Sequence, residues 1–297
     1  MARLRSVWND WWFEPAPLER WHVFRVLIYL YVPIDVLTSR WVAHHGLVPK
    51  QWYQPLWFAR ALDIPAPTAA GMAVATAGLL TLPLLAAAGK GRRIVGPLVA
   101  LLYFYWCFVA FTYGKVDHDR VALITALVVL PTVAWKGSGP DPRAGWALSM
   151  VQMSFMLTYF LAGVTKLLVA GPSWVTSTTI ERAIARRGTI VGDVLLHVPP
   201  LLIVMQFVIL AWELGAPLML LRNRVGRLYV YSAIAFHVAS LIGITIYFRS
   251  HLVCVIAFLP LERLHRRYVA WRSRGRAGDP PVVDTEHDDE GHALSKE

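Results

Sequence analysis

Long apolar runs, separated by short polar or basic segments, cover most of the chain. An α-helix needs roughly 20 apolar residues to cross a bilayer, and eight runs reach or approach that length. They occupy residues 21–38, 68–89, 94–113, 119–135, 146–170, 199–221, 228–247 and 250–263. The pattern predicts an all-α, polytopic integral membrane helical bundle with about eight transmembrane helices.

The remaining segments divide the chain into three parts. Residues 1–20 are basic, then rich in Trp, and then interrupted by Pro15 and Pro17, which predicts a short helix lying in the membrane interface. Residues 21–263 form the transmembrane domain, and IERAIARRG, within the connection 171–198, is expected to be a short surface helix. Residues 264–297 are highly charged and are predicted to be a disordered tail.

Composition supports a membrane protein and indicates which kinds of partner it binds. Of the 297 residues, 56% are hydrophobic and only 16% are charged, whereas soluble domains have about 25% charged residues. The net charge of +10 lies mostly in short connections, which indicates contact with lipid headgroups and not with nucleic acid. Neither of the two cysteines lies in a metal-binding motif, so no metal is expected.

Basic residues in the short connections also predict the orientation. Eight crossings place both termini on one side, together with the connections that contain Lys90, Arg92, Arg93 and Arg222. Because cytoplasmic connections are enriched in Lys and Arg, both termini are expected in the cytoplasm and the chain in the cell membrane.

Lys166 is the most conspicuous polar residue in the apolar runs. A lysine at the centre of a span costs roughly 2.5–3.5 kcal/mol on insertion, and less near an end. Tyr159 lies two turns earlier on the same helical face, and Gly163 lies one turn earlier, where it would leave room for a flat ring. The simpler interpretation is a boundary lysine whose amine reaches towards water.

Three further sites carry ionisable groups at or inside the spans. Asp117-His118-Asp119 precedes the fourth run, where an aspartate would cap the helix but the histidine has no such role. Glu213 is expected nearer the cytoplasmic half than Lys166, either as a functional carboxylate or as a structural partner of Arg25 or of a donor on another span. His237 is either a functional group or a hydrogen-bonded packing residue.

These residues also carry a resemblance to a known family. The positions concerned are Phe24-Arg25, Asp35, the stretch from Ala162 to Leu167, Glu213 within WELGAP, and Phe236-His237. In order and spacing they resemble the membrane half of vitamin K-dependent gamma-carboxylases and the bacterial proteins with the horizontally transferred transmembrane (HTTM) domain. The resemblance covers about residues 20–260.

The resemblance implies a specific chemistry. The lysine that matches Lys166 is held to deprotonate reduced vitamin K, whose anion then reacts with oxygen, and His118 best matches the histidine that supports this step. The implied ligand is reduced vitamin K or menaquinol, with His237, Glu213, Tyr159, Gly163 and Arg25 binding or supporting it. A free lysine has a pKa of about 10.4, so burial would have to lower it before the amine could act as a base.

Departures from that family leave two alternatives open. The carboxylases have a lysine at the position of Thr165, and a large lumenal domain where this chain has its charged tail. Carboxylation of protein glutamates therefore does not follow. One alternative is a non-enzymatic membrane factor for the export, maturation or immunity of a small secreted peptide or protein. The other is a proton-coupled transporter that uses Glu213 and His237.

Overall fold

The structure, a computed structural model, describes residues 2–91, 93–114 and 116–276, and its regular structure is almost entirely helical. The helices are α1 (Ala2–Phe13), α2 (Leu18–Thr38), α3 (Trp57–Ala61), α4 (Ala69–Ala87), α5 (Val95–Thr112), α6 (Val121–Val129), α7 (Pro142–Ala170), α8 (Thr179–Arg187), α9 (Ile190–Leu196), α10 (Pro199–Leu214), α11 (Arg224–Ile244), α12 (Arg249–Leu252) and α13 (Glu262–Arg276). Short 3₁₀ turns lie between several of them. The two-residue strands β1 (Ala16–Pro17) and β2 (Pro140–Asp141) pair antiparallel.

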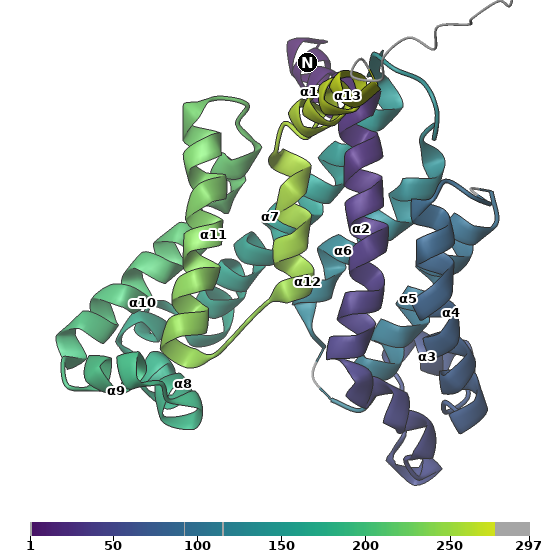
Figure 1. Cartoon of the computed structure of the whole chain (residues 1–297). Helices are drawn as coiled ribbons and strands as arrows, with labels where there is room; N and C mark the ends of the chain where they lie inside the picture. Colours follow the sequence, from purple (N-terminus) through teal and green to yellow (C-terminus); the bar gives the residue numbers. More distant parts are fainter. Residues whose placement is uncertain (1, 92, 115, 277–297) are drawn as a thin grey trace, which may run out of the picture.

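Helix α7 lies at the centre of the arrangement (Figure 1). It packs against α6 on one side and α10 on the other, while α2, α4 and α5 stack beyond α6. Helices α8 to α11 form the opposite side of the molecule, and α12 lies between the two groups (Figure 1). Side chains that α7 directs towards either group therefore meet residues far away in the sequence.

Within the described residues, α2, α4, α5, α7 and α11 are long and apolar enough to cross a membrane. Helices α9 and α10 meet at 109°, and counting them as one broken span raises the number to six. Large apolar side chains face outward, among them Val74, Leu101 and Phe207, which are 70%, 64% and 61% exposed. Outward apolar surface on this scale is suited to lipid, so the chain is an all-α membrane protein.

Local sequence explains the 29-residue length of α7. Asp141 caps its start, with the carboxylate accepting a hydrogen bond from the backbone N–H of Arg143 at 2.6 Å, and Pro142 occupies the first helical position. The helix ends at Gly171, whose φ of 65° is readily adopted by glycine. The intervening residues contain no proline, so the helix is continuous to Lys166 and beyond.

Three of the predicted spans contain a shorter α-helix than expected. Run 119–135 forms the nine-residue α6 flanked by 3₁₀ turns, and run 199–221 forms α10 and then a 3₁₀ segment at Ala216–Leu220. Run 250–263 begins with the four-residue α12 and continues as a 3₁₀ segment, Val253–Phe258. Proline accounts for two of these interruptions, since Pro131 and Pro217 lie where the α-helix gives way.

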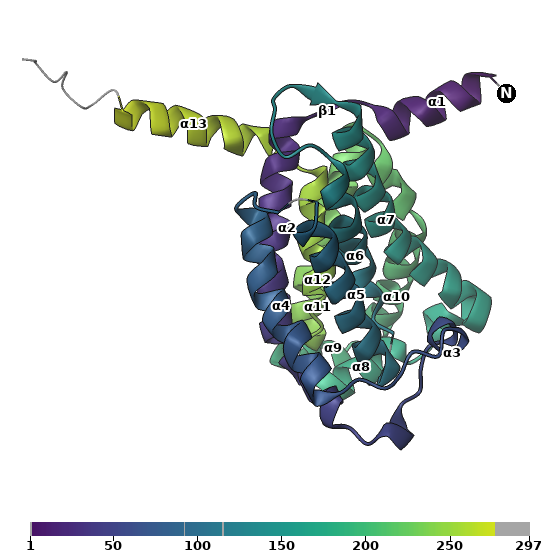
Figure 2. The same ribbon diagram turned by 90° about the vertical axis from the view of Figure 1, so that its right-hand side faces the viewer.

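The ends of the described chain are both helical. The short surface helix expected around residue 180 is confirmed as α8, and the N-terminal segment forms α1. The prediction of disorder from residue 264 is wrong as far as Arg276, because α13 covers that stretch; residues 277–297 lie outside the described residues. Helices α1 and α13 lie at one end of the bundle and project in opposite directions (Figure 2).

Candidate functional site

Lys166 and Glu213 form an ion pair between α7 and α10. Lys166 Nζ lies 2.6 Å from both carboxylate oxygens of Glu213, and 5.2 Å from the ring centre of Trp174. The side chains of Lys166 and Glu213 are 23% and 8% exposed. The expectation that the two residues lie in different halves of the membrane was wrong. The amine of Lys166 is therefore held by a carboxylate and an aromatic ring.

Gly163 allows α7 and α10 to approach this closely. A Cβ atom added there would lie 3.0 Å from Glu213 Cβ and 3.2 Å from the backbone nitrogen of Leu214. The room that the sequence led us to expect beside Gly163 is thus filled by α10. Gly163 serves the site by permitting the ion pair and does not provide space for a ring.

Gly163→Leu is expected to separate the two helices and to lower the midpoint of thermal unfolding in detergent by several degrees. Overpacking of this kind costs about 1–3 kcal/mol. Gly243→Leu is the matched control, because a Cβ atom there meets nothing within 4 Å. Equal midpoints for the two variants would contradict the close approach of α7 and α10.

A second polar pair lies further along α7. The hydroxyl of Tyr159 and Nε2 of His237 on α11 are 2.5 Å apart. The Tyr159 ring also packs edge-on against Trp212 and His251, with ring centres 4.8 Å away in both cases. His237 is thus positioned by a hydrogen bond, as the packing interpretation expected, yet its other nitrogen, Nδ1, has no hydrogen-bond partner among the described residues.

Two loop-to-helix junctions complete the cluster. His118 and Asp119 lie in the 3₁₀ turn before α6, and Phe248 and His251 lie at the start of α12. The His251 ring stacks on Phe155 with centres 4.1 Å apart, and neither of its nitrogens has a hydrogen-bond partner within the described part of the chain. Asp119 Oδ1 is also buried without one. Buried polar atoms are normally satisfied, so these positions fit a site filled by water or by a polar ligand.

These groups surround one cavity with a volume of about 190 Å³. Its walls combine ionisable and aromatic side chains: His118, Asp119, Thr158, Tyr159, Ala162, Lys166, Glu213, Phe236, His237, Phe248 and His251. This is several times the roughly 30 Å³ that one water molecule occupies in the liquid. The cavity can accommodate a small polar group.

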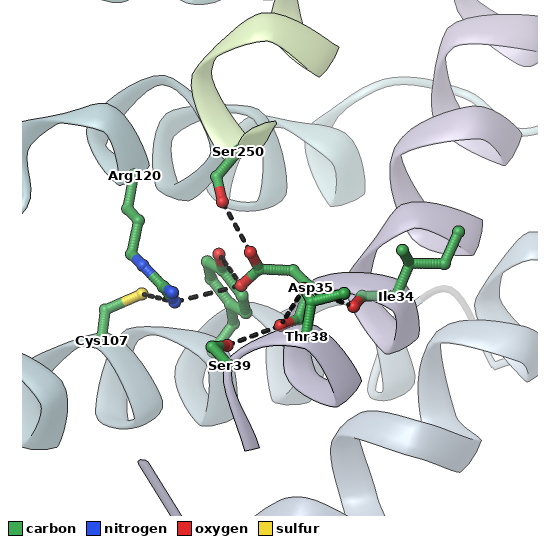
Figure 3. A network of polar contacts seen from close by, with 8 residues as sticks. Ile34, Asp35, Thr38, Ser39, Cys107, Arg120 and Ser250 are labelled. Atoms are coloured by element: carbon green, nitrogen blue, oxygen red, sulfur yellow. Dashed lines mark hydrogen bonds and ion pairs between the residues drawn. The ribbon is translucent and has the colours of Figure 1, made fainter. Parts of the chain in front are cut away.

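Asp35 lies at the centre of a buried network of polar contacts (Figure 3). Asp35 Oδ2 accepts hydrogen bonds from Tyr103 at 2.9 Å and from Arg120 at 3.0 Å, and Oδ1 accepts one from Ser250 at 2.6 Å. Arg120 directly follows Asp119, and Ser250 directly precedes His251. The network therefore positions two cavity segments from behind, although Asp35 itself does not line the cavity.

The structure brings together most of the residues singled out from the sequence. Lys166, Glu213, Tyr159, His237 and His118 all line the same cavity. Arg25 does not, since its guanidinium lies 4.6 Å from the ring centre of Trp135 and 3.5 Å from its carbonyl oxygen. The capping role considered for an aspartate before the fourth run was wrong, because Asp117 makes no side-chain capping bond and Asp119 does not occupy the cap position of α6.

His251 and Arg120 were not predicted as site residues from the sequence. His251 is a histidine within an apolar stretch, the same signal that drew attention to His237, but it was absorbed into the predicted span 250–263. Arg120 follows Asp119 at the start of an apolar run and so resembled an ordinary boundary residue. Only its ion pair with Asp35 distinguishes it.

Comparison with known protein families, with curated proteins and with solved structures found no match.

Proposed function

We propose that the chain is an HTTM-type membrane enzyme that binds the ring of a quinol, such as reduced vitamin K or menaquinol, in the cavity beside Lys166. The observation that carries the proposal is that one cavity collects an amine, two carboxylates, a phenol and three histidines among aromatic rings. An amphiphilic quinol would place its hydroxyl groups among these side chains and its tail among the apolar helices. Aromatic walls suit a flat ring, and the polar groups determine its orientation.

Lys166 is assigned as the base. In surroundings of low dielectric, moving a proton from Lys166 to Glu213 converts two charges into a neutral amine and a neutral acid. The amine then takes the proton of a quinol hydroxyl, leaving a quinolate anion beside the newly formed ammonium. Reaction with oxygen gives the epoxide and water, so that one quinol and one O₂ yield one epoxide and one H₂O. His118 and His237 would orient the ring.

The membrane arrangement follows from the same proposal. We place eight crossings in the cell membrane, with α9 and α10 as one broken crossing and the shorter elements around α6 and α12 as two others. Basic residues at the end that bears α1 and α13 support cytoplasmic termini. The Lys166 end of α7 then faces the extracytoplasmic side.

Purified protein in detergent, supplied with reduced vitamin K or menaquinol under air, is expected to form the epoxide, whereas Lys166→Ala is not. Mass spectrometry of the extracted quinones measures the product. Full epoxide formation by a folded Lys166→Ala protein would exclude Lys166 as the base. If well-folded wild-type protein forms none, the enzyme proposal fails, and the non-enzymatic peptide factor becomes the better account.

A further inference from the structure

A larger cavity lies at the other end of the bundle, where α1 and α13 are found. Its volume is about 660 Å³, and it is enclosed by the segment around β1, the starts of α7 and α11, and the 3₁₀ segments that follow α10 and α12. It has no lining residue in common with the cavity beside Lys166. Its role is therefore separate from the proposed quinol chemistry.

Arginines dominate the charge of this basic cavity. Arg20, Arg222, Arg227 and Arg263 line it, against the single carboxylate of Glu14. Glu14 pairs with Arg222, and Arg20 pairs with Glu262 at 2.7 Å. Arg227 and Arg263 form no ion pair among the described residues, and both are exposed. Two guanidinium groups thus remain available to an anion.

Apolar side chains also line the same cavity. Leu221 and Tyr231 are 43% and 56% exposed, and Phe258 and Leu259 are partly buried. At the nearby edge Trp11 donates a hydrogen bond to the carbonyl of Leu220 at 3.2 Å, and its ring centre lies 5.7 Å from the Arg222 guanidinium. The cavity thus combines exposed arginines with accessible apolar side chains, and an indole borders it.

This pattern matches an amphiphile better than a water-soluble anion. Arginine binds phosphate oxygens through paired N–H donors, whereas an apolar wall gains nothing from a small hydrated ion. The site also lies where long apolar helices end, which is the level of lipid headgroups, and tryptophan is typical of that layer.

We propose that this basic cavity binds the phosphate headgroup of an anionic membrane lipid. Arg227 and Arg263 contact the phosphate, and the upper part of one acyl chain lies against Leu221 and Tyr231. The bound lipid would fasten α13 and the segment around β1 to the starts of α7 and α11.

Native mass spectrometry of delipidated protein in a neutral detergent tests the proposal. Dioctanoyl phosphatidylglycerol is expected to bind at least tenfold more tightly than dioctanoyl phosphatidylcholine, which has the same chains but no net charge. An arginine near a membrane surface contributes about 1 kcal/mol to the binding of an anionic lipid, so Arg227→Gln/Arg263→Gln should weaken phosphatidylglycerol binding roughly tenfold to thirtyfold. Arg227→Lys/Arg263→Lys should restore part of it, which separates lost charge from lost folding.

The matched control is Arg224→Gln/Arg266→Gln, which removes the same charge from α11 and α13 without touching the lining. It should bind phosphatidylglycerol within about twofold of wild type. An equal loss in the control would overturn the proposal in favour of general surface attraction, and so would equal affinity of wild type for the two lipids. Complete displacement of phosphatidylglycerol by millimolar glycerol phosphate would also overturn the proposal, because it would show that the site binds a free phosphate and has no preference for a lipid. None of these results depends on epoxide formation.

Discussion

Lys166→Met is expected to abolish epoxide formation and also to destabilise the protein, and a second substitution separates the two effects. Removing the amine leaves the Glu213 carboxylate 8% exposed and without its cation. Breaking a fully buried ion pair costs about 3–5 kcal/mol, and the cost here is smaller because Lys166 is 23% exposed. Lys166→Met/Glu213→Met removes both charges, and unfolding midpoints in detergent should show that most of the stability returns.

Epoxide formation should not return in the double variant, because no amine is left to take the quinol proton. Recovery of both stability and turnover would show that the ion pair only holds α7 against α10. Glu213→Met alone leaves an unpaired ammonium and is expected to destabilise the protein in the same way. Measuring all three variants gives the coupling free energy of the pair independently of the chemistry.

Asp35→Ala is expected to cause the largest loss of stability among single substitutions in the described core. Three side chains donate hydrogen bonds to the Asp35 carboxylate, and Asp35 and Arg120 are 2% and 8% exposed. Leaving the Arg120 guanidinium buried without a counter-ion costs roughly 3–5 kcal/mol. The measurements are the unfolding midpoint and the yield of monodisperse protein, and Asp35→Ala/Arg120→Met should recover part of both.

Asp10→Ala is the control for that prediction, because Asp10 is exposed on α1 and its loss should change stability by no more than about 0.5 kcal/mol. A midpoint for Asp35→Ala as high as that of the control would mean that the network carries little stability. Asp35→Ala should also lower the rate of quinol turnover. Its partners Arg120 and Ser250 directly adjoin the cavity residues Asp119 and His251 in the sequence.

The apolar pattern predicted the helical architecture because a helix in lipid satisfies its own backbone groups, so length and hydropathy alone indicate its presence. The same pattern did not predict where α12 passes into a 3₁₀ segment, because no proline marks that point, as Pro131 does after α6. The charge density of residues 264–276 suggested disorder, yet α13 forms there, and Arg20 on α2 pairs with Glu262 at its first residue.

Five of the seven residues selected for the site line one cavity because ionisable groups inside apolar helices are costly unless they have a partner or a function. The sequence did not indicate which of these residues would contact one another. The contact between Lys166 and Glu213 depends on the close approach of α7 and α10 at Gly163. Arg25 is also an ionisable residue in an apolar run, but it does not line the cavity. It interacts with the ring and the carbonyl of Trp135, because these groups can also hold a cation.

The wide sequence separation of the Asp35 partners constrains the order in which the protein matures. Arg120 is 85 residues from Asp35 and Ser250 is 215 residues away. The chain emerges from the ribosome N-terminus first, so α2 enters the bilayer long before either donor has been translated. The cavity wall can be completed only once nearly all of the described chain has been synthesised, and a nascent protein arrested before Ser250 would carry an unfinished site.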